Sequence, residues 1–245
     1  MAYYTDYETI VSYSGSYAIT NSAVSNALAD MLVSHAGCTL SRHATVGTES
    51  SETNYAEVIY NGIYIRFYGS SSLGSLDAYF AYSANGTSIT SQSMNFYYVS
   101  NSNKYVDVKI RFYNLKSGGF LFQYYSSNNS WDLGFMGGPC TRISTGATLY
   151  FVSLEINTTG CVFVADGLSL VYYFPDTPYL GAYDVDGAKQ VLTQLFVSLE
   201  INTSAVRYIP SNVYSSARVL ITGIVQIGSR YFFIVNQYFA IELNS

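Results

Sequence analysis

Charge is the scarcest property of this sequence. Asp, Glu, Lys and Arg make up 11% of its 245 residues, against about 25% in typical globular proteins. The 11 basic residues are scattered along the chain and the net charge is −5, so we expect no binding to nucleic acid. Exposed strand edges are usually protected from pairing by charge. A β protein with so few charges is therefore expected to have its edges covered by neighbouring subunits.

Cysteine and histidine are almost absent as well. The three cysteines form no CxxC pair, and we expect buried thiols, with a Cys140–Cys161 bridge as the alternative. With two histidines, a Ser-His-Asp arrangement is nearly excluded. The sequence also lacks a Gly-x-Ser-x-Gly motif, a phosphate loop and an HExxH motif. It therefore predicts no enzyme and no cofactor.

Two stretches resemble metal sites without completing one. His35 and His43 flank Cys38, but zinc needs a fourth ligand and a recognisable second pair. The stretch 184–187, Asp-Val-Asp-Gly, begins like a calcium loop but lacks the third acidic position and the closing Glu. A packed histidine and a turn are the favoured interpretations, with a weak calcium site that includes Asp176 as the alternative to the turn. The prediction is no metal.

No segment directs the chain to a membrane. The first residues, MAYYTDYETI, lack the basic and apolar regions of a secretory signal. The longest apolar run, residues 219–227, is interrupted by Thr222, Gly223 and Gln226 and is too short to cross a bilayer. We therefore expect synthesis in a cytoplasm without membrane insertion, although a composition rich in Tyr, Ser and Thr is typical of an outward-facing protein.

One segment has helical periodicity. It follows the candidate N-cap Asn21, and Gly37 stands where a left-handed C-cap is expected. Its apolar face consists of Val24, Ala27, Leu28, Met31, Leu32 and His35. A second helical stretch is considered after Asp186-Gly187, where Ala188, Val191, Leu192 and Leu195 would share a face.

From Tyr55 onward the chain reads as strands separated by turn sequences. The predicted strands are 58–68, 78–83, 94–100, 106–113, 119–125, 148–157, 161–165, 169–174, 195–202, 219–227 and 231–243. They predict an all-β fold, an antiparallel β-sandwich or jelly-roll-like domain with a short N-terminal helix. Residues 1–45 would form a Tyr-rich leader and the helix, and residues 46–245 the β-sandwich, with two β subdomains dividing near residue 145 as the alternative.

The octapeptide FVSLEINT occurs twice, at residues 151–158 and 196–203. Within it apolar and polar residues alternate, which predicts a strand with one buried face in both copies. Glu155 and Glu200 could be imagined as paired carboxylates of a glycoside hydrolase. Because they lie beside Ser and Asn on the polar face, we expect them to be solvated. The repeat therefore indicates architecture rather than catalysis, and the two copies should occupy comparable sheet positions.

The most suggestive binding feature is the predicted loop 126–132. It places the only tryptophan, Trp131, among Asn128, Asn129 and Asp132. Carbohydrate sites use an aromatic face for the sugar ring and amide or carboxylate groups for its hydroxyls, so this loop could form a lectin-like site. A Trp131 that packs at the end of the sandwich is the favoured interpretation.

The order of features resembles that of tailed-bacteriophage virion proteins, in which a short helix precedes a β domain. The resemblance rests on the helix 17–37, the strand 57–68, the aromatic strand Asn95-Phe96-Tyr97-Tyr98-Val99, the strand 106–113 and Leu133-Gly134-Phe135-Met136-Gly137. It covers the first 140 residues and implies a structural part of a virion tail, baseplate or fibre-attachment region, with no catalytic residues. The partners would be copies of the chain and other virion proteins.

Assembly would then involve the leader tyrosines Tyr3, Tyr4, Tyr7, Tyr13 and Tyr17 as a docking element. The alternative, packing of this segment on its own β domain, also agrees with the pattern. A second function, attachment to host-surface glycans through Trp131, is the alternative to the structural role.

Overall fold

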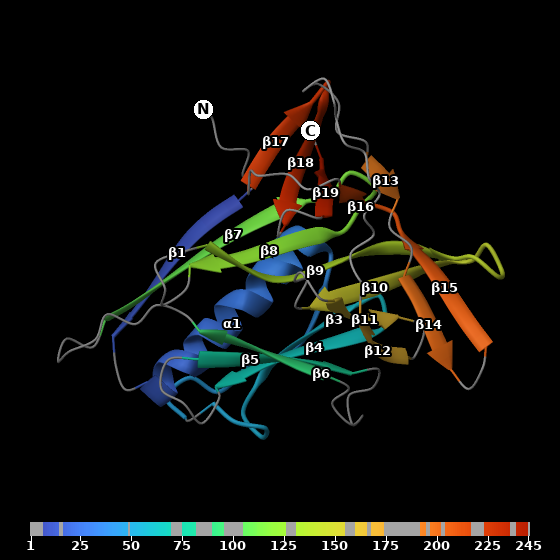
Figure 1. Cartoon of the computed structure of the whole chain (residues 1–245). Coiled ribbons are helices and arrows are strands. Elements are labelled where there is room, and N and C mark those ends of the chain that lie inside the picture. The colour runs from blue at the N-terminus through green and yellow to red at the C-terminus, as the bar shows by residue number, and fades with distance from the viewer. Residues whose placement is uncertain are drawn as a thin grey trace. The chain divides into compact units, whose positions relative to one another are not determined.

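The computed structural model describes residues 7–14, 17–48, 50–69, 75–81, 90–95, 105–125, 131–154, 160–165, 168–173, 192–194, 197–201, 204–216, 223–235 and 239–244. Within these ranges the chain has one helix and nineteen strands in three antiparallel sheets (Figure 1). The predicted all-β fold with an N-terminal helix is confirmed.

The chain forms two compact units. The N-terminal unit comprises residues 5–112 and 122–134, and the C-terminal unit comprises residues 1–4, 113–121 and 135–245. Residues 7–14 of the leader form strand β1 (Tyr7–Ser14), which pairs with β7 (Tyr105–Asn114). Helix α1 (Tyr17–Ala36) packs against strands of the same unit.

The N-terminal unit contains a five-stranded sheet in the order β2-β3-β4-β5-β6. The strands are β2 (Thr39–Arg42), β3 (Ala56–Tyr60), β4 (Ile63–Gly69), β5 (Ser75–Ala81) and β6 (Thr90–Asn95). Ile63, Ile65 and Phe67 alternate along β4 and are almost fully buried. A side chain at Gly69, on the same face, would meet the Asn21 amide of α1 at 2.6 Å. This face of the sheet is therefore the one that α1 covers.

Helix α1 starts four residues earlier than the sequence pattern predicts. Asn21 is not the N-cap, because the helix begins at Tyr17 and Asn21 lies buried within it. The other end agrees with the prediction: Gly37 has φ +67°, and the next amide, that of Cys38, donates back to the Leu32 carbonyl at 3.3 Å. Of the predicted apolar face, Val24, Leu28, Met31 and Leu32 are buried. No helix in the described ranges is long and apolar enough to cross a membrane.

The predicted strand 58–68 is a hairpin instead. β3 ends at Tyr60 and β4 begins at Ile63, with Asn61-Gly62 as a two-residue loop. Both loop residues have positive φ, +46° and +86°, as a type I′ turn requires. Asn-Gly between apolar runs is a strong hairpin signal, and the strand prediction ran through it. A single predicted strand, 231–243, likewise covers two observed strands, β18 (Arg230–Val235) and β19 (Phe239–Leu243).

The largest sheet has nine strands. Its order is β1-β7-β8-β9-β10-β11-β12, and β15 pairs with both β9 and β14. Apart from β1 and β7, the strands are β8 (Phe120–Tyr125), β9 (Trp131–Arg142), β10 (Thr148–Leu154), β11 (Gly160–Ala165), β12 (Leu168–Tyr173), β14 (Val197–Ile201) and β15 (Ser204–Pro210). Six of them, namely β7, β8, β10, β11, β12 and β14, lie at the predicted positions.

β9 is the longest strand, and the sequence pattern missed it. Its glycines weaken the strand pattern but allow close packing. A Cβ at Gly134 would stand 2.2 Å from the ring of Phe122, and one at Gly119 would stand 2.2 Å from the Gly137 carbonyl oxygen. Packing therefore explains Gly134, whereas Gly119 is explained by packing together with its positive φ of +99°.

The two copies of the octapeptide both contribute to this nine-stranded sheet. Phe151–Leu154 belongs to β10 and Val197–Ile201 to β14. Both copies are strands where described, but β10 pairs on both sides while β14 pairs with β15 alone. The prediction of a solvated polar face is wrong for the first copy, because Ser153 is 3% exposed. Glu155 lies outside the described residues, and Glu200 lies in β14 opposite Ala205.

A second five-stranded sheet belongs to the C-terminal unit, in the order β13-β16-β19-β18-β17. Besides β18 and β19 it contains β13 (Leu192–Gln194), β16 (Val213–Ser216) and β17 (Gly223–Ile227). The helical stretch considered on residues 188–195 is wrong for Leu192–Gln194, which are a strand; residues 188–191 lie outside the described ranges. All five residues of β19 are buried, so the central strand of this sheet is covered on both faces.

Candidate functional site

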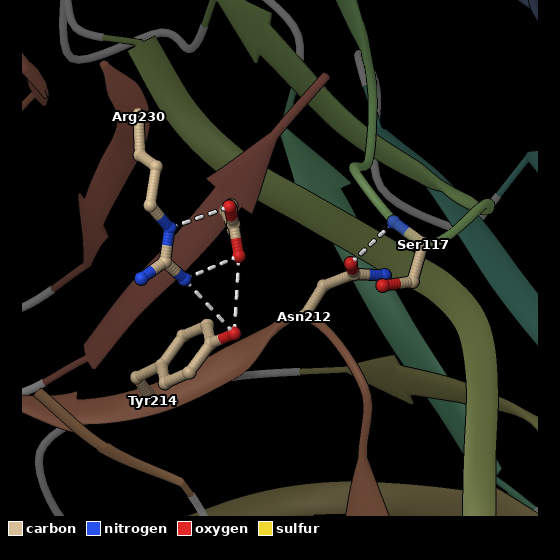
Figure 2. Close-up of polar contacts among 5 residues, drawn as sticks. Ser117, Asn212, Tyr214 and Arg230 are labelled. Carbon is tan, nitrogen blue, oxygen red and sulfur yellow. Dashed lines mark hydrogen bonds and ion pairs between the residues drawn. The ribbon is translucent and has the colours of Figure 1, made fainter. Parts of the chain in front are cut away.

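Three polar side chains meet on one face of the C-terminal five-stranded sheet. Tyr214, Arg230 and Glu242 come from β16, β18 and β19, three strands that lie side by side. Arg230 donates from Nε to Glu242 Oε1 at 2.7 Å and from a terminal nitrogen to Oε2 at 2.6 Å. The Tyr214 hydroxyl donates to Oε2 at 3.0 Å and accepts from Arg230 at 3.1 Å (Figure 2). We call this set the Arg230 cluster.

The charges of the Arg230 cluster are matched internally. Hydrogen bonds from Arg230 lower the pKa of Glu242, against the effect of burial. Burial and the neighbouring carboxylate raise the pKa of Tyr214. Glu242 thus stays ionised with both oxygens occupied, and Tyr214 stays protonated. A carboxylate held in this way is a poor general base, so the cluster links three strands and does not form a catalytic site.

Apolar residues flank the cluster. The guanidinium carbon of Arg230 lies 4.9 Å from the ring centroid of Phe232, and Tyr214 meets the same ring edge-on at 5.9 Å. Phe232, Ile234 and Ala240 form a buried group against which Val225 and Ile227 of β17 pack. The Arg230 cluster therefore closes one end of this apolar group.

Asn212 provides a second polar contact within the same unit. Its side-chain oxygen accepts from the Ser117 amide at 2.8 Å (Figure 2), and its nitrogen donates to the Gly118 carbonyl at 3.0 Å. Its own carbonyl accepts from the Glu242 amide at 2.8 Å. Asn212 is 1% exposed, so one buried amide holds the turn between β7 and β8 against the start of β16.

The N-terminal unit repeats the pairing of arginine with glutamate. Glu57 and Arg66 face each other across β3 and β4 and form an ion pair. Glu57 also accepts from the Ser41 hydroxyl at 2.7 Å. The guanidinium groups of Arg42 and Arg66 lie 4.6 and 4.9 Å from the ring centroid of Tyr55. One arginine–glutamate ion pair thus connects neighbouring strands in each unit.

Trp131 does not lie in a loop. It is the first residue of β9, followed there by Asp132, whereas Asn128 and Asn129 lie outside the described residues. The guanidinium carbon of Arg111 stands 3.8 Å from the Trp131 ring centroid, and Tyr125 meets the ring at 5.5 Å. The half-buried indole therefore has a cation packed on one of its ring faces.

The remaining predicted residues are divided among separate places. Tyr7 and Tyr13 lie in β1 opposite Phe112 and Val106, and Tyr17 begins α1. Tyr3 and Tyr4 lie outside the described residues, as do Asp176, Asp184 and Asp186.

The residues of the zinc-like spacing have other contacts. The ring of His35 lies 5.7 Å from that of Phe112, and His43 contacts Asp30 at 2.8 Å. Cys38 is buried, which raises the pKa of its thiol to about 12, and Cys140 is a buried thiol rather than half of a disulfide. In the described part of the chain, no three His, Cys, Asp or Glu side chains gather as metal ligands would.

The Arg230 cluster was missed because its members are separated in sequence and belong to no motif. Arg230 and Glu242 are twelve residues apart on neighbouring strands, and Tyr214 is sixteen residues before Arg230. Arg230 directly precedes the predicted strand 231–243 and Glu242 lies near its end, so dividing that stretch into a hairpin could have suggested the pair. Comparison of the chain with protein-family models, curated proteins and solved structures finds no match.

Proposed function

We propose that the chain is a structural building block of a bacteriophage virion, in the tail, baseplate or fibre-attachment region, which acts by packing against copies of itself and other virion proteins. The support is physical. The polar clusters of both units hold strands together, and the sheet edges have the composition expected of edges that neighbours cover.

The edge strands of the three sheets are the observation that supports the proposal most directly. Among the described strands, seven pair with a single neighbour: β1, β2, β6, β12, β13, β14 and β17. Their sequences contain no lysine and no proline, and their only charged residues are Glu8, Arg42 and Glu200. Monomeric β proteins protect such edges with lysine, proline or inward-pointing charge. Edges without this protection suit a subunit of an assembly.

The leader takes part in this proposal through β1. This strand carries Tyr7 and Tyr13, and β7 is its only partner among the described strands. A neighbouring subunit could extend the sheet at β1 through main-chain hydrogen bonds. We therefore keep the predicted docking role for the leader.

The test is association of the whole purified chain, alone and with particle proteins encoded by neighbouring genes. Sedimentation velocity over a wide concentration range should show self-association, and co-purification should recover at least one particle protein. A chain that remains a monodisperse monomer and binds none of those proteins would refute the structural role.

Attachment to host-surface glycans is the second candidate. Tyr125 and Trp131 are both half-buried, and Lys109 lies 5.2 Å from the Tyr125 ring centroid. Two cations beside two aromatic rings favour an acidic glycan over a neutral one. Glycan-array binding that Trp131→Ala abolishes would support this function, whereas binding that is unchanged by the substitution would exclude it.

A further inference from the structure

Strand β17 is the edge whose backbone geometry is clearest. It forms a hairpin with β18 in which Ile227 pairs with Arg230 across the loop Gly228-Ser229 (Figure 1). Gly228 has φ +62°, and Ser229 is not among the residues with positive φ, which makes the loop a type II′ turn. A two-residue loop of this kind sets which backbone groups point inward and which point outward.

The outward groups of β17 belong to Ile224 and Gln226. In a two-residue hairpin the residues that flank the loop form a hydrogen-bonded pair, and the pairs alternate along the strands. Ile227, Val225 and Gly223 therefore bond to β18. The amides and carbonyls of Ile224 and Gln226 point away from the sheet, towards the side on which no described strand lies.

This edge is held firmly and stays accessible. Val225 and Ile227 pack against the buried group of Phe232, Ile234 and Ala240. Gln226 is exposed, and the other four residues of β17 are partly exposed, in contrast to the fully buried β19. The strand is thus positioned by its own sheet, and no described strand pairs with its outer edge.

Charge indicates which partner fits. Residues 201–241 contain no Asp or Glu, although the chain has 16 of them and a net charge of −5. Arg230, at the start of the neighbouring strand, is neutralised by Glu242 at 2.6 Å. Copies of an acidic chain repel each other over most of their surface, whereas at β17 no carboxylate opposes contact. A second copy of the chain can therefore approach this edge without facing a carboxylate on β17 or β18.

We propose that two copies of the chain pair through β17, antiparallel and two-fold symmetric about Val225. This pairing places Ile224 opposite Gln226 of the second copy, so that the outward groups of both strands bond to each other, and no like charges meet. It is an isologous contact, the commonest type in homo-oligomers. The inference rests on the proposed assembly function and specifies one of its contacts.

A five-residue edge makes a small interface, below the roughly 1,200 Å² of stable complexes. We therefore expect a weak dimer in solution, which further contacts in a particle would reinforce. In the dimer four main-chain hydrogen bonds join the two strands, and two of them are donated by the Gln226 amides.

The experiment removes those donors while sparing the hairpin. Gln226→Pro deletes an outward N–H and leaves the bonds of Val225 and Ile227 to β18 intact, because proline is tolerated on an outward-facing edge position. Gln226→Thr is the matched control, since it loses the same side chain and keeps the amide. Gln226→Lys is a second variant that keeps the amide and adds a like charge to each copy at the edge.

Sedimentation velocity of the full chain should show a dimer whose dissociation constant rises about ten- to a hundredfold in Gln226→Pro, the effect of two lost hydrogen bonds. Gln226→Lys should also weaken the dimer, and Gln226→Thr should not. Amide hydrogen exchange gives an independent readout. The amides of Ile224 and Gln226 should become protected only in the dimer, and those of Val225 and Ile227 should be protected in the monomer and in folded Gln226→Pro alike.

Equal dimerisation of all the variants would overturn the β17 inference and leave the assembly function standing. Open-ended growth of the wild type would overturn the two-fold contact. A wild type that stays monomeric but binds particle proteins would also overturn the β17 inference alone. A monomer that binds no particle protein would refute the proposed function as well.

Discussion

Glu242→Gln tests the most connected polar contact in the described part of the C-terminal unit. Glu242 accepts two hydrogen bonds from Arg230 and one from Tyr214, and its side chain is 9% exposed. Glutamine keeps one acceptor, but its NH2 group would face the guanidinium donors. Hydrogen bonds to charged groups contribute about 1.5–3 kcal/mol each. Because the Arg230 side chain is 48% exposed, solvent screening reduces the total. We expect a loss of about 2–3 kcal/mol.

For a unit of this size such a loss lowers Tm by roughly 4–12 °C. The assay is urea unfolding together with amide hydrogen exchange in β18 and β19, because the two compact units need not unfold together. Glu52→Gln removes the same charge from an exposed turn residue and serves as the control, with an expected change within about 0.5 kcal/mol. A double-mutant cycle with Arg230→Gln isolates the coupling of the pair.

The pH dependence gives a second, independent check. The pKa of Glu242 in the folded protein lies below its ordinary value of 4.5, chiefly because Arg230 donates to the ionised form. The stabilisation is therefore fully present above the ordinary pKa and is lost as the pH falls through the lower, folded-state pKa. The difference between wild type and Glu242→Gln should shrink in acid. A loss below about 0.5 kcal/mol at neutral pH, or a loss that is the same at acidic pH, would refute the reasoning.

Three further predictions concern buried groups. Asn212→Ala leaves the Ser117 amide and the Gly118 carbonyl without their Asn212 partner and should lower the free energy of unfolding by about 2–3 kcal/mol. An unchanged midpoint in urea titration would contradict the stabilising role of Asn212. Ser153→Ala removes a buried hydroxyl that has no hydrogen-bond partner among the described residues and should leave stability unchanged or raise it by up to about 1 kcal/mol in urea titration, whereas a marked loss would contradict this expectation. Cys38 should resist alkylation at pH 8 in the folded protein, because burial raises its thiol pKa to about 12. The folded protein should therefore be destabilised only as the pH rises from the ordinary thiol pKa of 9.0 towards 12, where the unfolded chain loses the thiol proton first. Rapid labelling of Cys38 in the folded protein at pH 8 would contradict the prediction.

Much of the fold could be predicted because the spacing of apolar residues along a strand or helix shows that one of its faces is buried and the other exposed. The strands around residues 106–113 and 120–125 and the apolar side of α1 followed from alternation and helical spacing. The Asn61-Gly62 turn was also readable in the sequence and was overlooked. β9 was not predictable in this way, because the glycines at 134 and 137 weaken the strand pattern, and only the contacting ring of Phe122 explains Gly134.

The candidate site depended far more on tertiary structure. The sequence suggested Trp131 as a sugar contact, but β9 and β7 bring Arg111 onto its ring. The Arg230 cluster and the Asn212 contact join residues that no motif connects, the latter across 95 positions. Such contacts depend on which strands become neighbours, and single-strand patterns do not contain that information.

The sequence by itself determined the fold class, the helix and its C-cap, and the low charge of the strands, since each depends on neighbouring residues and on composition. Only the tertiary structure decided that Ser153 is buried, that residues 7–14 of the leader form a strand beside β7, and that Glu242 accepts hydrogen bonds from Arg230 and Tyr214. The physical reason is that a strand's sequence reports whether one of its faces meets water. What covers the other face, and which side chains lie opposite, is set by strands that are distant in the chain.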